Sequence, residues 1–557
     1  MSDERRQPQA SNDRPEHEAS DLSRSLEQGN GTPAGAAEDG AARPPARRGL
    51  MRSGLVVSSM TMVSRVLGLV RDVVIATLLG AGQGADAFFV AFKIPNFMRR
   101  LFAEGAFNQA FVPVLSEYST TRTRDEVREL LNAVCGSLAA VLALITALAI
   151  VAAPWLTWLF APGFARDPEK LALTADMLRL TFPYLLLISL TAFAGSVLNT
   201  WNRFAVPAFT PVLLNLSLIG AALLLTPLMS EPSMALAWGV LIAGAAQLLF
   251  QVPFLVRLGL MPRPWPNFAH EGVRRILKLM APALFGVSVS QINLLLDTIL
   301  ASLLAAGSVS WLYYSDRLVE LPLGVFGVAI GTVILPALSR RHAEASTEHF
   351  SQMLDWALRA VLLLGLPAAL ALALLAEPLL ITLFHYGAMT DNDIVMAAMS
   401  LRAYALGLVA FMLIKVLAPG FFARHDTKTP VKVGIVAMVA NMVFNLILIW
   451  PLAHAGLALA TALSAFLNAG MLAWLLRRQG VLNFQPGWGR FGVQLGGGCV
   501  AMAGVLILLA PDWHQWLTWS LVARALWMLG LVAAGGATYF AWLGITGVRV
   551  RHFRLKG

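Results

Sequence analysis

The chain has 557 residues, of which 57% are hydrophobic and 13% are charged, and its formal net charge is +10. Soluble globular domains carry roughly 25% charged residues, so this composition excludes an ordinary soluble protein. The two cysteines, Cys135 and Cys499, lie in apolar runs without the spacing of a metal or redox site, which predicts packing roles for both.

Residues 1–50 differ from the rest of the chain because they are polar, charged and rich in Pro, Gly and Ala. Such a segment buries too little apolar surface to offset its ordering entropy, so we predict a disordered cytoplasmic tail. The apolar run that follows has the length of a full span, unlike the short apolar region of a signal peptide.

Apolar runs fill the remaining chain, and each is long enough to cross a hydrocarbon core of about 30 Å as a helix. We therefore predict an all-α polytopic membrane protein with about fourteen spans, whose boundaries are uncertain by roughly 2–4 residues. Prolines inside the second, eighth and ninth runs predict kinks or breaks there. The predicted spans are 53–80, 85–110, 127–160, 172–199, 205–229, 232–257, 273–306, 309–338, 352–386, 391–422, 430–451, 454–477, 488–510 and 517–546.

The loops between these spans alternate between basic and nearly uncharged, and only the segment GFARDPEK breaks the alternation. By the positive-inside rule the basic loops are cytoplasmic, and both termini lie on the same side. The net charge of +10 reflects this bias and contact with anionic lipid headgroups, so we expect no nucleic-acid partner. The basic loops carry Arg122, Arg124, Arg128, Arg203, Arg257, Arg263, Arg274, Arg275, Lys278, Arg340, Arg341, Arg424, Lys428, Lys432, Arg477, Arg478 and Arg490.

Two similar stretches suggest an internal repeat. AFVPVLSEY ends the second span and VILPALSRR ends the eighth, which aligns Pro113 with Pro336 and Ser116 with Ser339. An offset of an even number of spans keeps the membrane orientation, so the halves would be parallel repeats around a central site. We predict an N-terminal lobe at 51–258, a second lobe at 259–480, and an added helix pair with a short basic tail at 481–557.

Ionisable side chains at membrane depth gather in a few spans, although each costs roughly 2.5–3.5 kcal/mol on insertion scales. At about 100° per residue, Asp86, Lys93, Asn96 and Arg100 fall close to one face of the second span. Lipid cannot solvate such a face. We therefore expect it to line a hydrated internal cavity.

Two interpretations of these charges stay open. Asp72, Glu104 and Glu320 lie close to arginines and would form structural ion pairs that hold helices together. The basic groups nevertheless outnumber plausible acidic partners, and Arg suits bidentate contact with phosphate. The surplus therefore predicts a phosphorylated or otherwise anionic substrate for Arg65, Lys93, Arg99, Arg100 and Arg317.

A second set of polar residues lies in the predicted second lobe. Asn441 and Asn445 are four residues apart on one helical face, Thr461 lies in the next span, and Asp297 is a solitary carboxylate in the seventh. Oxygen ligands of this kind suit a small hard cation, which predicts a Na⁺ or H⁺ site. Hydrogen bonds between neighbouring helices explain the same residues without a cation, and both interpretations stay open.

Three stretches carry a family resemblance: SSMTMVSRVLGLVRD at 58–72, GADAFFVAFKIPNFMRRLFAEGAFNQAFVPVLSEY at 84–118 and YYSDRLVELPLGVFGVAIGTVILPALS at 313–339. They resemble the lipid II flippase family, MurJ or MviN, of the multidrug/oligosaccharidyl-lipid/polysaccharide exporter superfamily. The resemblance covers essentially everything after residue 50. It implies two six-helix lobes with an added helix pair, and cavity residues that map onto Arg65, Arg71, Asp86, Arg99, Arg100, Asp316 and Arg317.

The function implied by the resemblance is alternating-access transport of lipid II from the inner to the outer leaflet of the bacterial cytoplasmic membrane. Lipid II is the undecaprenyl-pyrophosphate-linked disaccharide-pentapeptide used for peptidoglycan synthesis. We expect no cofactor, and we expect coupling to Na⁺, H⁺ or the membrane potential. Three alternatives stay open: an exporter of another polyprenyl-pyrophosphate-linked oligosaccharide, a cation-coupled drug exporter, and a membrane enzyme acting on polyprenyl phosphates. A drug exporter would favour an acidic cavity, and the loops contain no HExxH or DxD motif for an enzyme.

Overall fold

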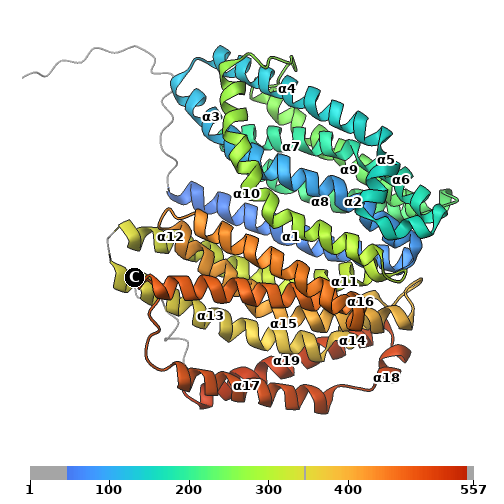
Figure 1. Ribbon diagram of the computed structural model, residues 1–557, viewed down its shortest axis with the longest axis vertical. Coiled ribbons are helices and arrows are strands. Elements are labelled where there is room, and N and C mark those ends of the chain that lie inside the picture. The colour runs from blue at the N-terminus through green and yellow to red at the C-terminus, as the bar shows by residue number, and fades with distance from the viewer. Residues whose placement is uncertain (1–46, 344–345, 549–557) are drawn as a thin grey trace, which may run out of the picture. The chain divides into compact units, whose positions relative to one another are not determined.

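The computed structural model of the chain describes residues 47–343 and 346–548. The predicted tail at 1–50 and the last nine residues, 549–557, therefore lie almost entirely outside the described part. From Ser53 onward the chain forms one compact unit. Its regular structure in the described ranges is helical throughout (Figure 1).

The first lobe consists of the helices that precede residue 258. Its interior is formed where α2 packs on α6 and α9, and where α7 packs on α4, α8 and α9. The bounds are α1 (Arg47–Leu79), α2 (Gln83–Arg99), η1 (Arg100–Phe107), α3 (Asn108–Thr121), α4 (Arg124–Val151), α5 (Ala153–Phe160), η2 (Pro162–Arg166), α6 (Pro168–Thr181), α7 (Pro183–Thr200), α8 (Ala205–Leu224), η3 (Thr226–Leu228) and α9 (Pro232–Arg257).

The second lobe is built around α15, which packs on α11, α12, α13 and α16, and the added pair α17 and α19 packs on α13 and α14 (Figure 1). The bounds are α11 (Ser308–Pro322), η4 (Leu323–Gly327), α12 (Val328–Ala343), α13 (Thr347–Leu374), α14 (Ala376–Phe384), α15 (Asp391–Phe422), α16 (Lys428–Arg478), α17 (Trp488–Leu509), α18 (Trp513–Thr518) and α19 (Leu521–Ile545).

Helix α10 (Glu271–Ser302) packs against both lobes. Its first half contacts η1, α3 and α4, where Val273 and Ile276 join a hydrophobic cluster with Phe107 and Phe111. It also packs on α16 of the second lobe. The predicted boundary at 258/259 therefore cuts the sequence before a helix whose packing is shared between the lobes.

Two π-helical segments, η1 and η4, interrupt the second and eighth predicted spans. η1 begins at Arg100 and η4 begins at Leu323, which is the residue placed opposite Arg100 when Pro113 is aligned with Pro336. π-helical segments inside α-helices are rare and often occur at functional sites. Their matching positions agree with the repeat suggested by the sequence.

Within the described residues, nine helices are long and apolar enough to cross a membrane by themselves. One of them, α16, joins two predicted spans across Ala453, whose φ of 48° and ψ of −127° are not helical. The predicted spans outside this set correspond to α1, α2 with α3, α10, and α11 with α12. These are the spans in which the sequence places ionisable side chains, which lower their hydropathy. The predicted all-α, multi-pass fold is confirmed.

Candidate substrate cavity

A cavity of about 370 Å³ lies between the two lobes, and we call it the central cavity. One wall is apolar and aromatic, with Phe89, Phe92 and Leu312 among its residues. The rest of the lining includes charged and polar side chains from α2, η1, α10, α11 and α16. These are Lys93, Asn96, Arg100, Asp297, Asp316, Arg317, Glu320 and Thr461.

A second cavity of about 230 Å³ lies beside α1, and we call it the α1 pocket. It shares Arg317 and Glu320 with the central cavity, so the two cavities meet at these side chains. The first lobe supplies Ser64, Arg65, Arg71, Asp72 and Asn215 to its lining. Taken together, the linings contain five basic and four acidic side chains, a smaller excess of positive charge than the sequence suggested.

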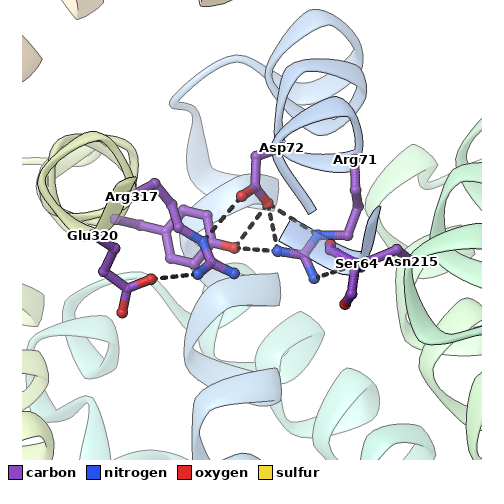
Figure 2. Close-up of polar contacts among 7 residues, drawn as sticks. Ser64, Arg71, Asp72, Asn215, Arg317 and Glu320 are labelled. Atoms are coloured by element: carbon purple, nitrogen blue, oxygen red, sulfur yellow. Dashed lines mark hydrogen bonds and ion pairs between the residues drawn. The ribbon is translucent and has the colours of Figure 1, made fainter. Parts of the chain in front are cut away.

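Asp72 is the centre of the polar network that joins the lobes (Figure 2). Its carboxylate is 1% exposed and accepts hydrogen bonds from Arg71 Nη2 at 2.7 Å and from the Tyr313 hydroxyl at 2.9 Å. Arg317 Nε lies 3.0 Å from the other carboxylate oxygen. A single buried carboxylate is therefore shared by arginines from α1 and α11, the arrangement that buried charges require to be stable.

Asn215 and Tyr313 fix the orientation of Arg71. Arg71 Nη1 donates to Asn215 Oδ1 at 3.1 Å, while Asn215 Nδ2 donates to the backbone oxygen of Ser64 at 2.9 Å. Arg71 Nη2 also donates to the Tyr313 hydroxyl at 3.0 Å. Neither partner was predicted from the sequence, although Asn215 stands out as a lone amide in the apolar run LLNLSLIG.

Arg317 is held less tightly than Arg71. Its side chain is 33% exposed and pairs with Glu320 at 2.6 Å, and the Glu320 side chain is 45% exposed. The guanidinium carbon lies 5.5 Å from the centroid of the Tyr313 ring, within the range of a cation–π contact. The ion pairs proposed from sequence for Asp72 and Glu320 are thus both present, while the Glu104 side chain lies outside the described part.

Asp86 does not line either cavity, contrary to the position expected for it. Its carboxylate is 1% exposed and lies 2.9 Å from Lys170 Nζ. It also accepts hydrogen bonds from the backbone N–H groups of Gly307 and Ser310 and from the Ser310 hydroxyl, at 2.7–3.0 Å. Asp86 therefore caps the start of α11, where the helix dipole favours an anion, and ties α2 and α6 to the second lobe.

Lys170 is a partner that the sequence analysis missed. It is buried on α6, and its Nζ lies 4.1 Å from the centroid of the Phe164 ring. The signal was present in the sequence, because Lys170 belongs to GFARDPEK, the one segment that broke the alternation of loop charges. A lysine beside a span, on the side where the connecting segments are otherwise uncharged, is a reason to look for a carboxylate partner.

Arg65 and Arg99 take different positions. Arg65 lines the α1 pocket, and a Cβ atom at Gly324 would overlap its guanidinium, so Arg65 lies directly against η4. Arg99 Nε donates to Asn96 Oδ1 at 2.9 Å, and the Arg99 side chain is not part of the lining of either cavity. Of the neighbouring pair of arginines, Arg100 is the one that faces the central cavity.

The four residues of the predicted cation site lie together. Asn445 Nδ2 donates to Asp297 Oδ1 at 2.8 Å and to Asn441 Oδ1 at 2.9 Å, and the Thr461 hydroxyl lies 3.4 Å from Asp297 Oδ2. Asn441 and Asn445 are fully buried, and Asn445 Oδ1 has no hydrogen-bond partner among the described residues. Asp297 and Thr461 also line the central cavity, so this cluster adjoins the space between the lobes.

The lobes touch closely at the ends of α1 and α11. The Tyr314 hydroxyl donates to the backbone oxygen of Gly80 at 2.8 Å, and the Ala388 N–H donates to the backbone oxygen of Thr77 at 2.8 Å. Gly80 has a φ of 59°, and a Cβ atom there would overlap the Ala388 backbone. Together with Asp86, these contacts close the space between the lobes at this end.

A family model described as lipid II flippase MurJ matches residues 75–526. The chain belongs to the lipid II flippase MurJ family. A probable lipid II flippase MurJ from Vibrio cholerae is 48% identical over 512 residues, which cover 91% of this chain and 98% of that relative. Lipid II flippase MurJ from Burkholderia cenocepacia is 42% identical over 513 residues, which cover 91% of this chain and 99% of that relative.

Solved structures agree with membership of the MurJ family. A structure of lipid II flippase MurJ in an inward closed conformation matches with a TM-score of 0.75 and 27% identity, covering 88% of this chain and 98% of that one. An inward-facing multidrug resistance MATE transporter of the MOP superfamily matches with a TM-score of 0.63 over 77% of this chain and 98% of that one. At 15% identity this second likeness shows the fold alone. The predicted family is confirmed.

Proposed function

We propose that the chain moves lipid II from the inner to the outer leaflet of the bacterial cytoplasmic membrane, with the pyrophosphate held by the basic side chains of α1, η1 and α11 that line the two cavities. Membership of the MurJ family supports lipid II as the substrate. The observation that carries the site is Asp72, whose carboxylate holds Arg71 of the first lobe and Arg317 of the second at the junction of the two cavities.

The chemistry of the substrate explains why such a cavity is needed. A pyrophosphate-linked saccharide is too polar to cross hydrocarbon, so the protein must replace its hydration shell. Guanidinium groups do this well, since hydrogen bonds between charged partners are roughly twice as strong as neutral ones, and Arg can bind two oxygens at once. The cations available are Arg65, Arg71, Lys93, Arg100 and Arg317.

Because the cavities contain nearly as many acidic as basic side chains, the substrate must displace an existing ion pair. An arriving phosphate must compete with carboxylates for Arg317. Glu320 is half-exposed, and exposed ion pairs are worth about 0–1 kcal/mol, so the phosphate displaces Glu320 at little cost. Asp72 is buried and stays in place, where it keeps Arg71 and Arg317 close together.

Orientation follows from the loop charges. We place both termini in the cytoplasm and the end closed by Asp86 toward the periplasm, because the loops at that end carry few Lys or Arg. Alternating access then requires the Asp86 contacts to separate. A reporter fused near Pro232 that behaved as cytoplasmic would contradict this orientation.

We also propose that Asp297, Asn441, Asn445 and Thr461 bind Na⁺ or a proton. The support is the buried Oδ1 atom of Asn445, for which the described part of the chain offers no hydrogen-bond partner, beside a carboxylate that lines the central cavity. An unpaired buried amide oxygen is costly, and a small hard cation would satisfy it. Occupancy would then bias the lobes between the inward-open and outward-open states.

The experiment uses two neighbouring arginines. In cells depleted of their own flippase, Arg100→Ala should abolish delivery of lipid II to the outer leaflet, because Arg100 lines the central cavity. Arg99→Ala is the matched control and should retain more transport, because Arg99 lines neither cavity. Equal, full transport by both variants, at equal amounts in the membrane, would overturn the proposed site.

A further inference from the structure

The linker between α9 and α10 lies along the surface of α4. The backbone N–H groups of Arg263 and Trp265 donate to the side-chain and backbone oxygens of Asn132, at 2.6 and 3.4 Å. The N–H of Asn267 donates to the Ser137 hydroxyl at 3.2 Å. A Cβ atom at Gly136 would overlap the backbone of Trp265, so glycine at this position lets the linker lie directly against the helix.

Between Pro262 and Asn267 every backbone donor is used. Pro262, Pro264 and Pro266 have no N–H, and the three residues that alternate with them, from Arg263 to Asn267, all donate to α4. Backbone groups that water cannot reach must be satisfied within the protein. These hydrogen bonds hold the linker on α4 and also satisfy its backbone donors at a depth where water is scarce.

The linker nevertheless exposes apolar side chains. Trp265 is 74% exposed, and Met261 and Phe268 are 46% and 48% exposed. Arg263, next to Trp265, is also exposed. Trp beside basic residues is the composition typical of the level at which lipid headgroups meet the hydrocarbon core.

The position of the linker on α4 gives its depth. Ser137, which accepts the hydrogen bond from Asn267, is followed on the same helix face, seven and eleven residues later, by Leu144 and Leu148, which are each 61% exposed. The linker thus covers the beginning of the same helix face that is apolar and exposed farther along. The next helix, α5, follows the end of α4 directly and carries two exposed tryptophans, Trp155 and Trp158.

Trp265, which lies against Gly136, and the exposed tryptophans of α5 are separated by about the thickness of a membrane. At 1.5 Å per residue, Gly136 lies about 30 Å along α4 and α5 from Trp155 and Trp158. The hydrocarbon core of a bilayer is about 30 Å thick. If Trp155 and Trp158 mark one interface, Trp265 lies at the other.

We propose that residues 261–268 form an interfacial anchor, with Trp265, Met261 and Phe268 inserted between lipid headgroups and acyl chains. The anchor fixes the depth of the first lobe and of the beginning of α10, the helix shared by both lobes. The partner is the lipid surface rather than a soluble domain that reads proline-rich segments, because the exposed side chains continue the lipid-facing row of α4.

The test measures depth with a nitroxide spin label on the full chain in lipid nanodiscs, after Cys135→Ala and Cys499→Ala. The labelled sites are Trp265→Cys, Asp125→Cys as the aqueous control, and Leu144→Cys as the hydrocarbon control; Asp125 and Leu144 are 90% and 61% exposed. At position 265 we expect collisions with a water-soluble nickel reagent to be several-fold rarer than at 125, and collisions with oxygen to fall between those at 125 and 144.

The other outcomes would overturn the anchor. Nickel collisions at 265 equal to those at 125 would place the segment in water, open to a soluble partner. Exclusion of both reagents would place it inside the protein. Gly136→Leu is a second variant, which should displace the linker and raise the mobility of the label at 265; an unchanged spectrum would show that the linker does not rest on α4.

Discussion

Asp72 and Asp86 are both buried carboxylates that tie the first lobe to α11, and they differ in what surrounds them. Each is 1% exposed. Around Asp86 the partners are sealed: Lys170 and Ser310 are buried, and backbone N–H groups of α11 complete the contact. Around Asp72 one partner, Arg317, is 33% exposed and faces two cavities.

The difference separates two functions that the same chemistry can serve. A sealed pair must be broken as a whole when the lobes separate, so it stabilises one state of the protein. A pair open to a cavity lets one partner change ligands while the other remains in place. We therefore assign closure to Asp86 and substrate exchange to the network around Asp72.

Asp86→Ala should have the largest effect on stability. It leaves Lys170 as an uncompensated buried charge, and removing one partner of a buried pair costs about 3–5 kcal/mol. Chemical unfolding in detergent measures the change. Asp176→Ala is the matched control, since Asp176 is 53% exposed in its pair with Arg179 and its loss should stay within about 0.5 kcal/mol.

A double variant sharpens this prediction. Adding Lys170→Met to Asp86→Ala removes the orphaned charge and should restore part of the lost free energy of unfolding, which a double-mutant cycle reports. If the losses of unfolding free energy in Asp86→Ala and in Lys170→Met simply add in the double variant, Lys170 and Asp86 do not act as a pair.

Asp297→Asn should change the ion dependence of transport with a smaller effect on folding. The amide keeps the volume and the hydrogen bond to Asn445 but removes the charge that a cation needs. Lipid II transport into vesicles with and without a Na⁺ or proton gradient is the measurement. Asp316→Asn, which neutralises another carboxylate of the central cavity, is the control; the same response in both variants would exclude a specific role for the cluster.

Glu320→Gln should have the smallest effect on stability and a clear effect on binding. Because an exposed pair is worth up to about 1 kcal/mol, releasing Arg317 from Glu320 should tighten pyrophosphate binding up to about fivefold. The control is Glu377→Gln, which removes the exposed pair with Arg402. Weaker binding by Glu320→Gln would mean that Glu320 supports the substrate site instead of competing with the substrate.

The sequence was sufficient for the all-helical, multi-pass fold, because hydropathy and helical periodicity are local properties. Arg100 and Lys93 line the central cavity as their spacing on one helical face predicted. The same spacing misplaced Asp86, since a helical face gives a direction around the axis but not a depth along it. Two turns before Lys93, the partners of Asp86 are the start of α11 and Lys170 rather than the cavity.

The partners that orient Arg71 come from distant segments, and the sequence did not supply them. Asn215 lies 144 residues from Arg71, and Tyr313 lies 242 residues from it. No periodicity within one helix connects such residues. The excess of positive charge in the cavities is small because Asp297 and Asp316 line the central cavity while Arg99 lines neither cavity.

The most direct test of the central claim is the affinity of the purified protein for lipid II and for undecaprenyl pyrophosphate, with Arg317→Ala and Arg317→Lys compared with the unaltered chain. Hydrogen bonds to charged groups contribute about 1.5–3 kcal/mol, so Arg317→Ala should weaken binding of both ligands about 10- to 100-fold. Arg317→Lys should recover only part of this, because Lys cannot bind two oxygens in a plane. Unchanged affinity for both ligands in Arg317→Ala would contradict the assignment of the pyrophosphate to the network around Asp72.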